Sequence, residues 1–221
     1  MKFFGSSPLA SFVFLLGAGS ALGATIYDRA SSAAPKQVSA KDKCPTAKVV
    51  TTTTIQVGNA QVNRTTFACP DDSLRQASQN PPPSTKQLPT GSFARRNAAE
   101  CRNPAPECQC GQSFVCNCQN VTATAPLSTD CATLISATQV VAQAEGPTFT
   151  VEPDNFELIS FGTCALEWTN FACETLEYCW DELGNTGGVV NQLCFEQGGG
   201  TAAACNANDD LWLLQSLRVG S

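Results

Sequence analysis

Histidine is absent from all 221 residues of this chain. Its absence excludes catalysis by Ser-His-Asp or Cys-His groups and any metal site that needs imidazole ligands. Lysine does not occur after Lys86, so the C-terminal part has no lysine to act as a base or to bind phosphate. Paired carboxylates, as in glycosidases, are the catalytic option that remains, but many solvated acids are expected on an acidic domain. We therefore expect a protein that is not an enzyme and has no cofactor.

Basic residues are scarce in the second half of the chain. Residues 1–103 contain 12 Lys and Arg and five Asp and Glu, whereas residues 104–221 contain only Arg218 and 14 Asp and Glu. The two parts carry +7 and −13, which together give the net charge of −6. A domain at −13 repels phosphate backbones, so nucleic acid is not expected as a partner. Neutral or cationic ligands, such as uncharged sugars, remain.

Long apolar segments are missing beyond the first two dozen residues. Met1-Lys2, the apolar run LASFVFLLGAG and the small residues ALGA follow one another in the order of a secretory signal peptide, which predicts a signal over residues 1–23. The run is too short to span a bilayer, and no later segment approaches ~18 apolar residues. We expect an extracellular, secreted chain without membrane insertion.

Cysteine, by contrast, is abundant. In the stretch CQCGQSFVCNCQN, two C-x-C pairs would suit either a thiolate metal cluster or disulfides. Secretion favours disulfides, and the absence of histidine argues against a metal, so we expect no metal site. Because the count is odd, one cysteine should stay unpaired or bond to another chain. The 13 cysteines are Cys44, Cys69, Cys101, Cys108, Cys110, Cys116, Cys118, Cys131, Cys164, Cys173, Cys179, Cys194 and Cys205.

The N-terminal part divides into a polar, disordered lead over 24–43 and a β-rich segment over 44–70. Val, Thr and Ile alternate on either side of Gly58-Asn59, which predicts a hairpin whose ends a Cys44–Cys69 bridge would join. Two N-x-T sequons begin at Asn63 and Asn120, and glycans there would keep those segments at the surface.

Residues 71–96 are rich in Pro, Ser and Gln and predict a linker. Arg95-Arg96 closes it, and two interpretations of this pair remain open. A processing protease would cleave there and make residues 24–96 a propeptide or a separate product. Alternatively, the pair consists of two ordinary surface arginines.

Residues 97–221 are long enough for one core. Helical spacing predicts a helix capped by Ser128 or Thr129 and ended by Gly146-Pro147, and a second helix over Asp181 to Cys194. Three short strands fill the interval TFTVEPDNFELISFGTCALEWTNF, GGGTAAAC is interpreted as a loop, and LWLLQSLRV as a closing strand. The expected fold class is α+β: a small disulfide-rich sandwich with an antiparallel sheet and two helices, preceded by the hairpin and the linker.

A sugar site needs a flat apolar face surrounded by hydrogen-bonding groups. The segment LEYCWDE offers both, since Tyr178 and Trp180 would share one face of a strand, with Cys179 behind them. Asp181 or Asn170 would bind sugar hydroxyls. Trp168 and Trp212 are expected in the core, and for Trp180 a surface and a core position both stay open.

The motifs DCATLI, GPTFTV, FGTCAL, LEYCWD, C…GGG…C and WLL run in this order across residues 130–214. In this order they resemble the small secreted glycan-binding domain of mushroom-forming fungi, the Y-three type. The resemblance implies a compact α/β/α-type sandwich on an antiparallel sheet, recognition of fucosylated or N-acetylgalactosamine-bearing glycans, and a homodimer formed through sheet edges.

The leading hypothesis is a lectin-like fungal protein whose 97–221 domain binds a neutral or fucosylated glycan of a cell surface or wall, in defence or wall recognition. The alternative is a disulfide-rich effector that acts on other cells, similar to fungal necrosis-inducing effectors and killer toxins. A structural wall protein is a third option.

Overall fold

The computed structural model describes residues 44–70, 97–120 and 124–219, together with Ala40, Leu74 and Lys86–Gln87. All of these belong to one compact unit, Ala33–Ser221. The predicted signal peptide lies outside the described residues, as do most of the lead and of the linker, including Arg95 and Arg96.

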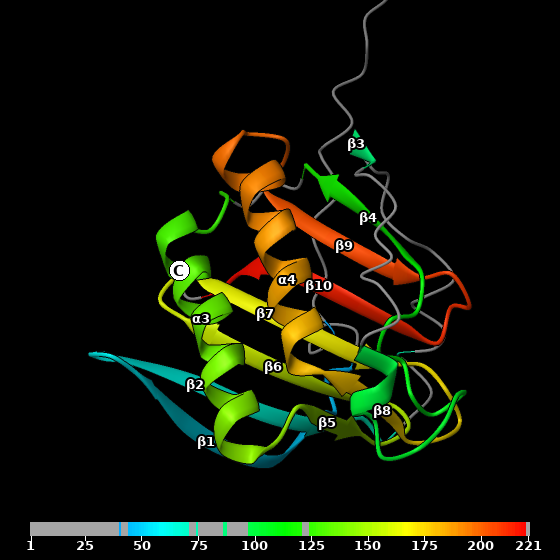
Figure 1. Cartoon of the computed structure of the whole chain (residues 1–221). Coiled ribbons are helices and arrows are strands. Elements are labelled where there is room, and N and C mark those ends of the chain that lie inside the picture. The colour runs from blue at the N-terminus through cyan, green and yellow to red at the C-terminus, as the bar shows by residue number, and fades with distance from the viewer. Residues whose placement is uncertain are drawn as a thin grey trace, which may run out of the picture. The chain divides into compact units, whose positions relative to one another are not determined.

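An eight-stranded sheet forms the centre of the unit (Figure 1). Its strands follow the order β1-β2-β6-β7-β10-β9-β4-β3, and every neighbouring pair is antiparallel. Two further strands pair in a small second sheet, β5 (Thr148–Val151) with β8 (Leu176–Cys179). The strands of the main sheet are β1 (Lys48–Val57), β2 (Ala60–Ala68), β3 (Lys86–Gln87), β4 (Phe114–Gln119), β6 (Asn155–Phe161), β7 (Cys164–Asn170), β9 (Ala202–Ala207) and β10 (Trp212–Arg218).

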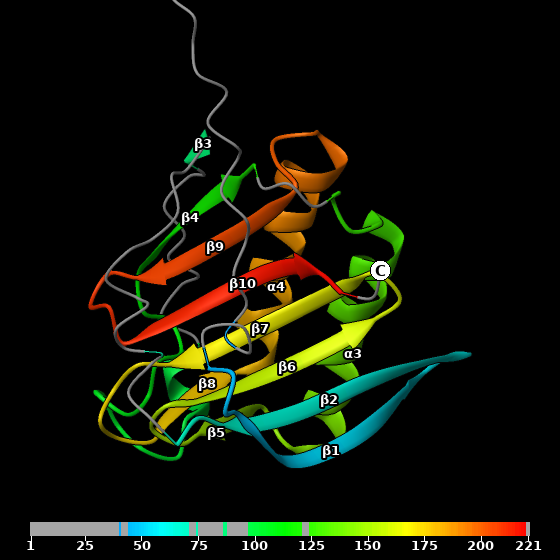
Figure 2. The same ribbon diagram turned by 180° about the vertical axis from the view of Figure 1, so that it is seen from behind.

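Two helices, α3 (Ser128–Glu145) and α4 (Trp180–Val190), lie side by side against one face of this sheet, whereas Figure 2 shows the strands from the opposite face. A 3₁₀ turn, η1 (Asn97–Glu100), and a π-helical turn, η2 (Asn191–Glu196), complete the described elements. The buried residues of α3 recur every three or four positions, as the sequence predicts for a helix with one apolar stripe. The predicted α+β class is confirmed.

The main core lies between the two helices and the sheet. Trp168 and Trp212 are completely buried in it, as expected from the sequence, and their rings stack on each other at 6.0 Å. Close packing of such large side chains is the main favourable contribution to stability.

The hairpin β1–β2 precedes the rest of the chain in sequence, but in space it forms one edge of the same sheet. Strand β2 pairs with β6 over Asn63–Ala68, and Phe67 stacks on Phe156 with ring centroids 4.7 Å apart. The predicted hairpin is confirmed, and so is the Cys44–Cys69 disulfide that joins its ends. Asn63 and Asn120 are both exposed, and their glycosylation stays a prediction.

Three strands were missed from the sequence: β3, which lies in the segment predicted as a linker, β4 and β9. GGGTAAAC is not only a loop, because Ala202–Ala207 form β9 between β10 and β4. The cysteine-rich stretch supplies β4, in which Cys116 and Cys118 alternate with polar residues. Alanine has a weak strand preference, so β9 depends on its neighbours in the sheet.

The start of α3 also differs from expectation. Neither Ser128 nor Thr129 caps the helix, because Leu127 occupies the N-cap without a side-chain bond. Asp130 instead accepts two hydrogen bonds from Thr163, one from the backbone N–H and one from the hydroxyl. A Cβ at Gly162 would lie 2.5 Å from the Asp130 carboxylate, so glycine is needed there as well as for the positive φ of 54°.

Six disulfides use twelve of the thirteen cysteines, which confirms the expected pairing. The four cysteines of the two C-x-C pairs bond to four different partners. The two pairs are therefore not bonded to each other and do not form one cluster. Cys173, the thirteenth, is exposed. The bonds are Cys44–Cys69, Cys101–Cys108, Cys110–Cys179, Cys116–Cys205, Cys118–Cys194 and Cys131–Cys164.

Arg64 of β2 holds the hairpin to the acidic part of the chain. It forms ion pairs with Glu157, whose side chain is 2% exposed, and with Glu145 at the surface. Its guanidinium also lies 4.7 Å from the ring centroid of Trp180. Thr66 donates a second hydrogen bond to Glu157. The buried carboxylate therefore depends on two side chains from the hairpin.

We predict that Arg64→Ala lowers the free energy of unfolding by roughly 3 kcal/mol, because it leaves the buried charge of Glu157 without its cation. Denaturant unfolding followed by tryptophan fluorescence measures the change. Glu145→Gln is the matched control: it removes the exposed partner of the same arginine and should cost less than about 1 kcal/mol. Equal unfolding midpoints for the wild type and Arg64→Ala would contradict this account of the hairpin.

Candidate functional site

Three of the four residues predicted to contact a sugar are buried. Tyr178, Trp180 and Asn170 each have 0% of their surface exposed, so the expected open aromatic face is wrong. The chain changes from β8 to α4 at Trp180, so the two rings do not follow one another along a strand. Phe149 lies between them, with centroids 6.0 Å from Tyr178 and 4.3 Å from Trp180. Both rings belong to the core.

Asn170 has a structural role instead. Its amide nitrogen donates to the carbonyl oxygens of Val151 and Glu174, and its side-chain oxygen accepts the N–H of Ala172. All these bonds stay within the fold. The Asn170 side chain therefore fixes the turn after β7 and has no polar atom directed to a ligand.

Asp181, the fourth predicted residue, is exposed and lines an open pocket of about 440 Å³. The pocket lies between η1, α3, the turn before β5 and α4. It brings together two carboxyl groups, three amides and a small apolar surface from Ala142 and Pro147, and its size is within the range of small-ligand sites. The lining residues are Glu100, Gln139, Ala142, Gln143, Pro147, Asp181 and Asn185.

The two carboxyl groups of the pocket affect each other. Partial burial, and then the negative charge of Asp181, raise the pKa of Glu100 above its ordinary value. Among the described residues that line the pocket, none is basic and could offset this repulsion. The pocket therefore suits a ligand that donates hydrogen bonds to carboxylates or carries a positive charge, and it repels anions.

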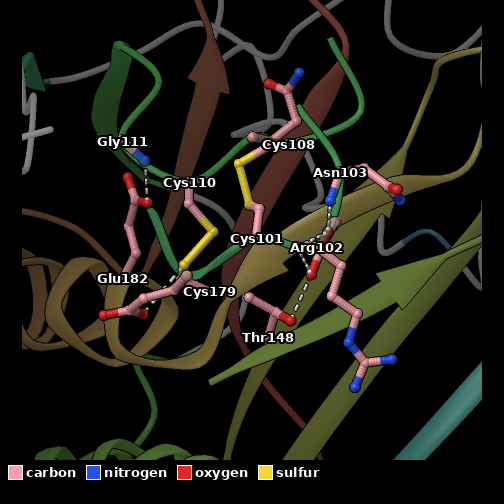
Figure 3. The surroundings of a disulfide bond; sticks show 12 residues. Cys101, Arg102, Asn103, Cys108, Cys110, Gly111, Thr148, Cys179 and Glu182 are labelled. Carbon is pink, nitrogen blue, oxygen red and sulfur yellow. Dashed lines mark hydrogen bonds between the residues drawn. A yellow bond between two sulfur atoms is a disulfide. The ribbon is translucent and has the colours of Figure 1, made fainter. Parts of the chain in front are cut away.

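Glu100 lines the pocket, and the segment that follows it, up to Gly111, is held by Glu177 of β8. The Glu177 carboxylate accepts hydrogen bonds from the backbone N–H groups of Arg102 and Asn103 and from the Thr148 hydroxyl (Figure 3). Burial alone would raise the pKa of Glu177, but these hydrogen bonds outweigh it and lower the pKa. A buried carboxylate thus fixes the backbone directly after Glu100.

Two disulfides also hold the segment from Glu100 to Gly111. Cys101–Cys108 closes the segment on itself, and Cys110–Cys179 ties it to the residue before α4 (Figure 3). Each pocket carboxylate is thereby placed one or two residues from a bonded cysteine. The sulfur atoms of Cys101, Cys108 and Cys110 lie within 4.8 Å of one another, a spacing that would suit a metal ion. Because all three are bonded in disulfides, they offer no thiolate ligand in this state.

Behind the pocket, Glu182 is a buried acid at the first turn of α4. One of its oxygens accepts the N–H of Gly111 at 2.7 Å, and the other has no hydrogen-bond partner among the described residues. Burial raises the pKa of Glu182 to about 7, although the Gly111 bond opposes the shift. Burial, followed by the proximity of Glu182, also raises the pKa of Tyr178 well above its usual range.

Most of the pocket was missed from the sequence, although a signal for it exists. Gln139 and Gln143 are four residues apart on α3, and Asp181 and Asn185 are four apart on α4, so each pair shares one helix face. Helical periodicity therefore predicts two polar faces. These faces meet beside Glu100 only because of the way the two helices pack, and the periodicity of the sequence does not predict that packing.

Compared with protein-family models, with curated proteins and with solved structures, this chain matches none. No helix in the described part is both long and apolar enough to cross a membrane. The class that the fold and the pocket define is therefore a disulfide-rich α+β protein with an acidic surface pocket.

We predict that Glu182 makes the protein more stable at acidic pH. Its pKa is about 7 in the folded state, against an ordinary value of 4.5 for a glutamate in the unfolded chain. Between these two pH values the folded state therefore binds more protons than the unfolded state. This contribution to stability is complete below about pH 4.5 and is lost as the pH rises through about 7, a change of ~3 kcal/mol. Glu182→Gln, which cannot ionise, should lack it.

Unfolding free energies measured from pH 4 to 8 test this expectation. The difference between Glu182→Gln and the wild type should grow as the pH rises, in favour of the variant. Glu174→Gln, a change at an exposed acid, is the control and should keep the pH dependence of the wild type. Parallel curves for the wild type and Glu182→Gln would show that Glu182 does not titrate in this range.

Proposed function

We propose that the protein is a secreted, lectin-like binding protein whose pocket between η1, α3 and α4 takes a neutral glycan, fucosylated glycans included. The single observation that carries this proposal is the pocket itself. Two carboxyl groups and three amides converge there on a volume of about 440 Å³. Carboxylates and amides are groups that bind the hydroxyls of a sugar.

Two further features support it. Six disulfides are typical of proteins made in an oxidising compartment, which fits the signal peptide predicted over residues 1–23. Among the described residues that line the pocket, none is a serine, threonine or cysteine that would act as a nucleophile. Its two carboxyl groups leave glycoside hydrolysis as the catalytic alternative, which the test below distinguishes from binding.

The pocket also limits the kind of glycan. None of its described lining residues is aromatic, so these residues offer affinity through hydrogen bonds and through the small apolar surface of Ala142 and Pro147. Sialylated or sulfated sugars would meet the charges of Glu100 and Asp181 and should be rejected. Such selectivity suits recognition of uncharged cell-surface or wall glycans, in defence or in contact with a wall.

A glycan array probed with the secreted, oxidised protein tests the proposal, followed by titration with the best ligand. Asp181→Asn and Glu100→Gln should each weaken binding about tenfold or more, since a hydrogen bond to a charged group contributes ~1.5–3 kcal/mol. Glu174→Gln, which does not line the pocket, should bind as the wild type does.

An array on which no neutral glycan binds would refute the proposal. So would a ligand that binds the two pocket variants as tightly as the wild type. Recovery of shortened sugars after incubation would show an enzyme and not a binding protein.

A further inference from the structure

Two of the six disulfides lie in contact with each other. The sulfur atoms of Cys101, Cys108 and Cys110 are within 4.8 Å of one another, and Cys110 is bonded to Cys179 (Figure 3). The cysteines of both bonds also share one small buried cluster. A thiolate released from either bond would therefore be within reach of the other.

Access to this pair is one-sided. Among the twelve bonded cysteines, all of which the structure describes, Cys101 alone is not buried. Cys108, Cys110 and Cys179 are 3%, 1% and 0% exposed. An external thiolate can attack only a sulfur that it can reach, so attack falls on Cys101, and Cys108 becomes the leaving group.

We propose that Cys101–Cys108 and Cys110–Cys179 form a thiol–disulfide exchange site that takes two electrons from a dithiol and moves the remaining disulfide to Cys108–Cys110. Nothing in the proposed glycan binding requires this activity. The substrate class is a dithiol, either a small molecule or a protein with two neighbouring thiols.

The exchange has three steps. A thiolate of the dithiol attacks the Cys101 sulfur, forms a mixed disulfide and releases Cys108 as a thiolate. The second thiol of the dithiol then attacks the mixed disulfide, which leaves the dithiol oxidised to a disulfide and Cys101 as a thiol. Finally, the Cys108 thiolate attacks the Cys110 sulfur, so that a Cys108–Cys110 bond forms and Cys179 leaves.

Glu100 lies at the leaving sulfur of the last step, since its Oε2 is 3.6 Å from Cys179 Sγ. The dithiol releases two protons in the first two steps, and the Cys101 and Cys179 thiolates take up two protons from water. The Cys179 thiol can then donate a hydrogen bond to the Glu100 carboxylate. The last step rearranges bonds without changing the oxidation state of the protein, so the two electrons from the dithiol balance the loss of one disulfide.

The exchange would also reach the pocket, a consequence that rests on the proposed function. In the product, neither Cys101 nor Cys179 is bonded. Glu100 directly precedes Cys101, and Asp181 follows Cys179 by two residues. The disulfide that cross-links residues 101–111 to the start of α4 would then be lost, and with it the covalent constraint on how far Glu100 lies from Asp181. Ligand binding in the pocket would become sensitive to reduction.

Limited reduction of the intact protein tests the exchange without any glycan, so its outcome is separate from that of the glycan array. The oxidised protein is treated with one equivalent of dithiothreitol at neutral pH, quenched with acid and alkylated, and the labelled cysteines are mapped by mass spectrometry. Cys173, which is exposed and outside the six disulfides, takes up label before reduction as well and serves as the reference. Beyond it, we expect label on Cys101 and Cys179 in equal amounts, with Cys108 and Cys110 bonded to each other. Label on Cys101 and Cys108 with Cys110–Cys179 intact would overturn the proposal, as would first reduction at any of the other four disulfides.

A double variant provides the second test. Replacement of both Cys101 and Cys108 by serine removes the point of entry, so Cys110–Cys179 should resist the same treatment. Cys44→Ser with Cys69→Ser removes a distant disulfide and should leave the labelling of Cys101 and Cys179 unchanged. Reduction of Cys110–Cys179 at the same rate with and without Cys101–Cys108 would show that no relay operates.

Discussion

The structure depends on how the acidic part of the chain, residues 104–221, buries carboxylates with almost no cations of its own. Glu157, Glu167, Glu177 and Glu182 are each 2% exposed or less, yet the only basic residue after residue 103 is Arg218. An ionised carboxylate without partners is too costly in a protein interior. Each of the four must therefore obtain hydrogen bonds or positive charge from elsewhere in the fold, or carry a proton.

The partners come mainly from segments that precede the acidic region. Arg64 of the hairpin pairs with Glu157, the N–H of Ala40 donates to Glu167 at 2.6 Å, and the N–H groups of Arg102 and Asn103 donate to Glu177. For Glu182 the described partner is the N–H of Gly111, which does not compensate its burial, and its pKa rises accordingly. The carboxylates thus act as attachment points. They explain why a hairpin with its own disulfide is part of the main sheet and why the segment after η1 stays against β8.

The pocket is a consequence of the same attachments. Glu177 and two disulfides hold the segment that directly follows Glu100. Cys179 directly precedes α4, the helix that contains Asp181. Two like charges are therefore kept close together in a setting that raises the pKa of one of them. The two disulfides that hold this arrangement also place four cysteines, Cys101, Cys108, Cys110 and Cys179, in one cluster. Because Cys101 is not buried, these disulfides are also the ones that an external thiol reaches most easily.

Local patterns in the sequence determined the hairpin, the two helices, several strands and the Cys44–Cys69 bond, because each involves residues close along the chain. The alternation around Gly58-Asn59 and the spacing from Cys131 to Val141 report directly which face of an element is buried. Only the tertiary structure decided the rest. Strand β9 is rich in alanine and extends because β10 and β4 bond it on both sides, and Trp180 is buried because Phe149, Trp168 and Arg64 enclose the start of α4. The pocket needs four separate elements to meet, and no periodicity within one element encodes their packing.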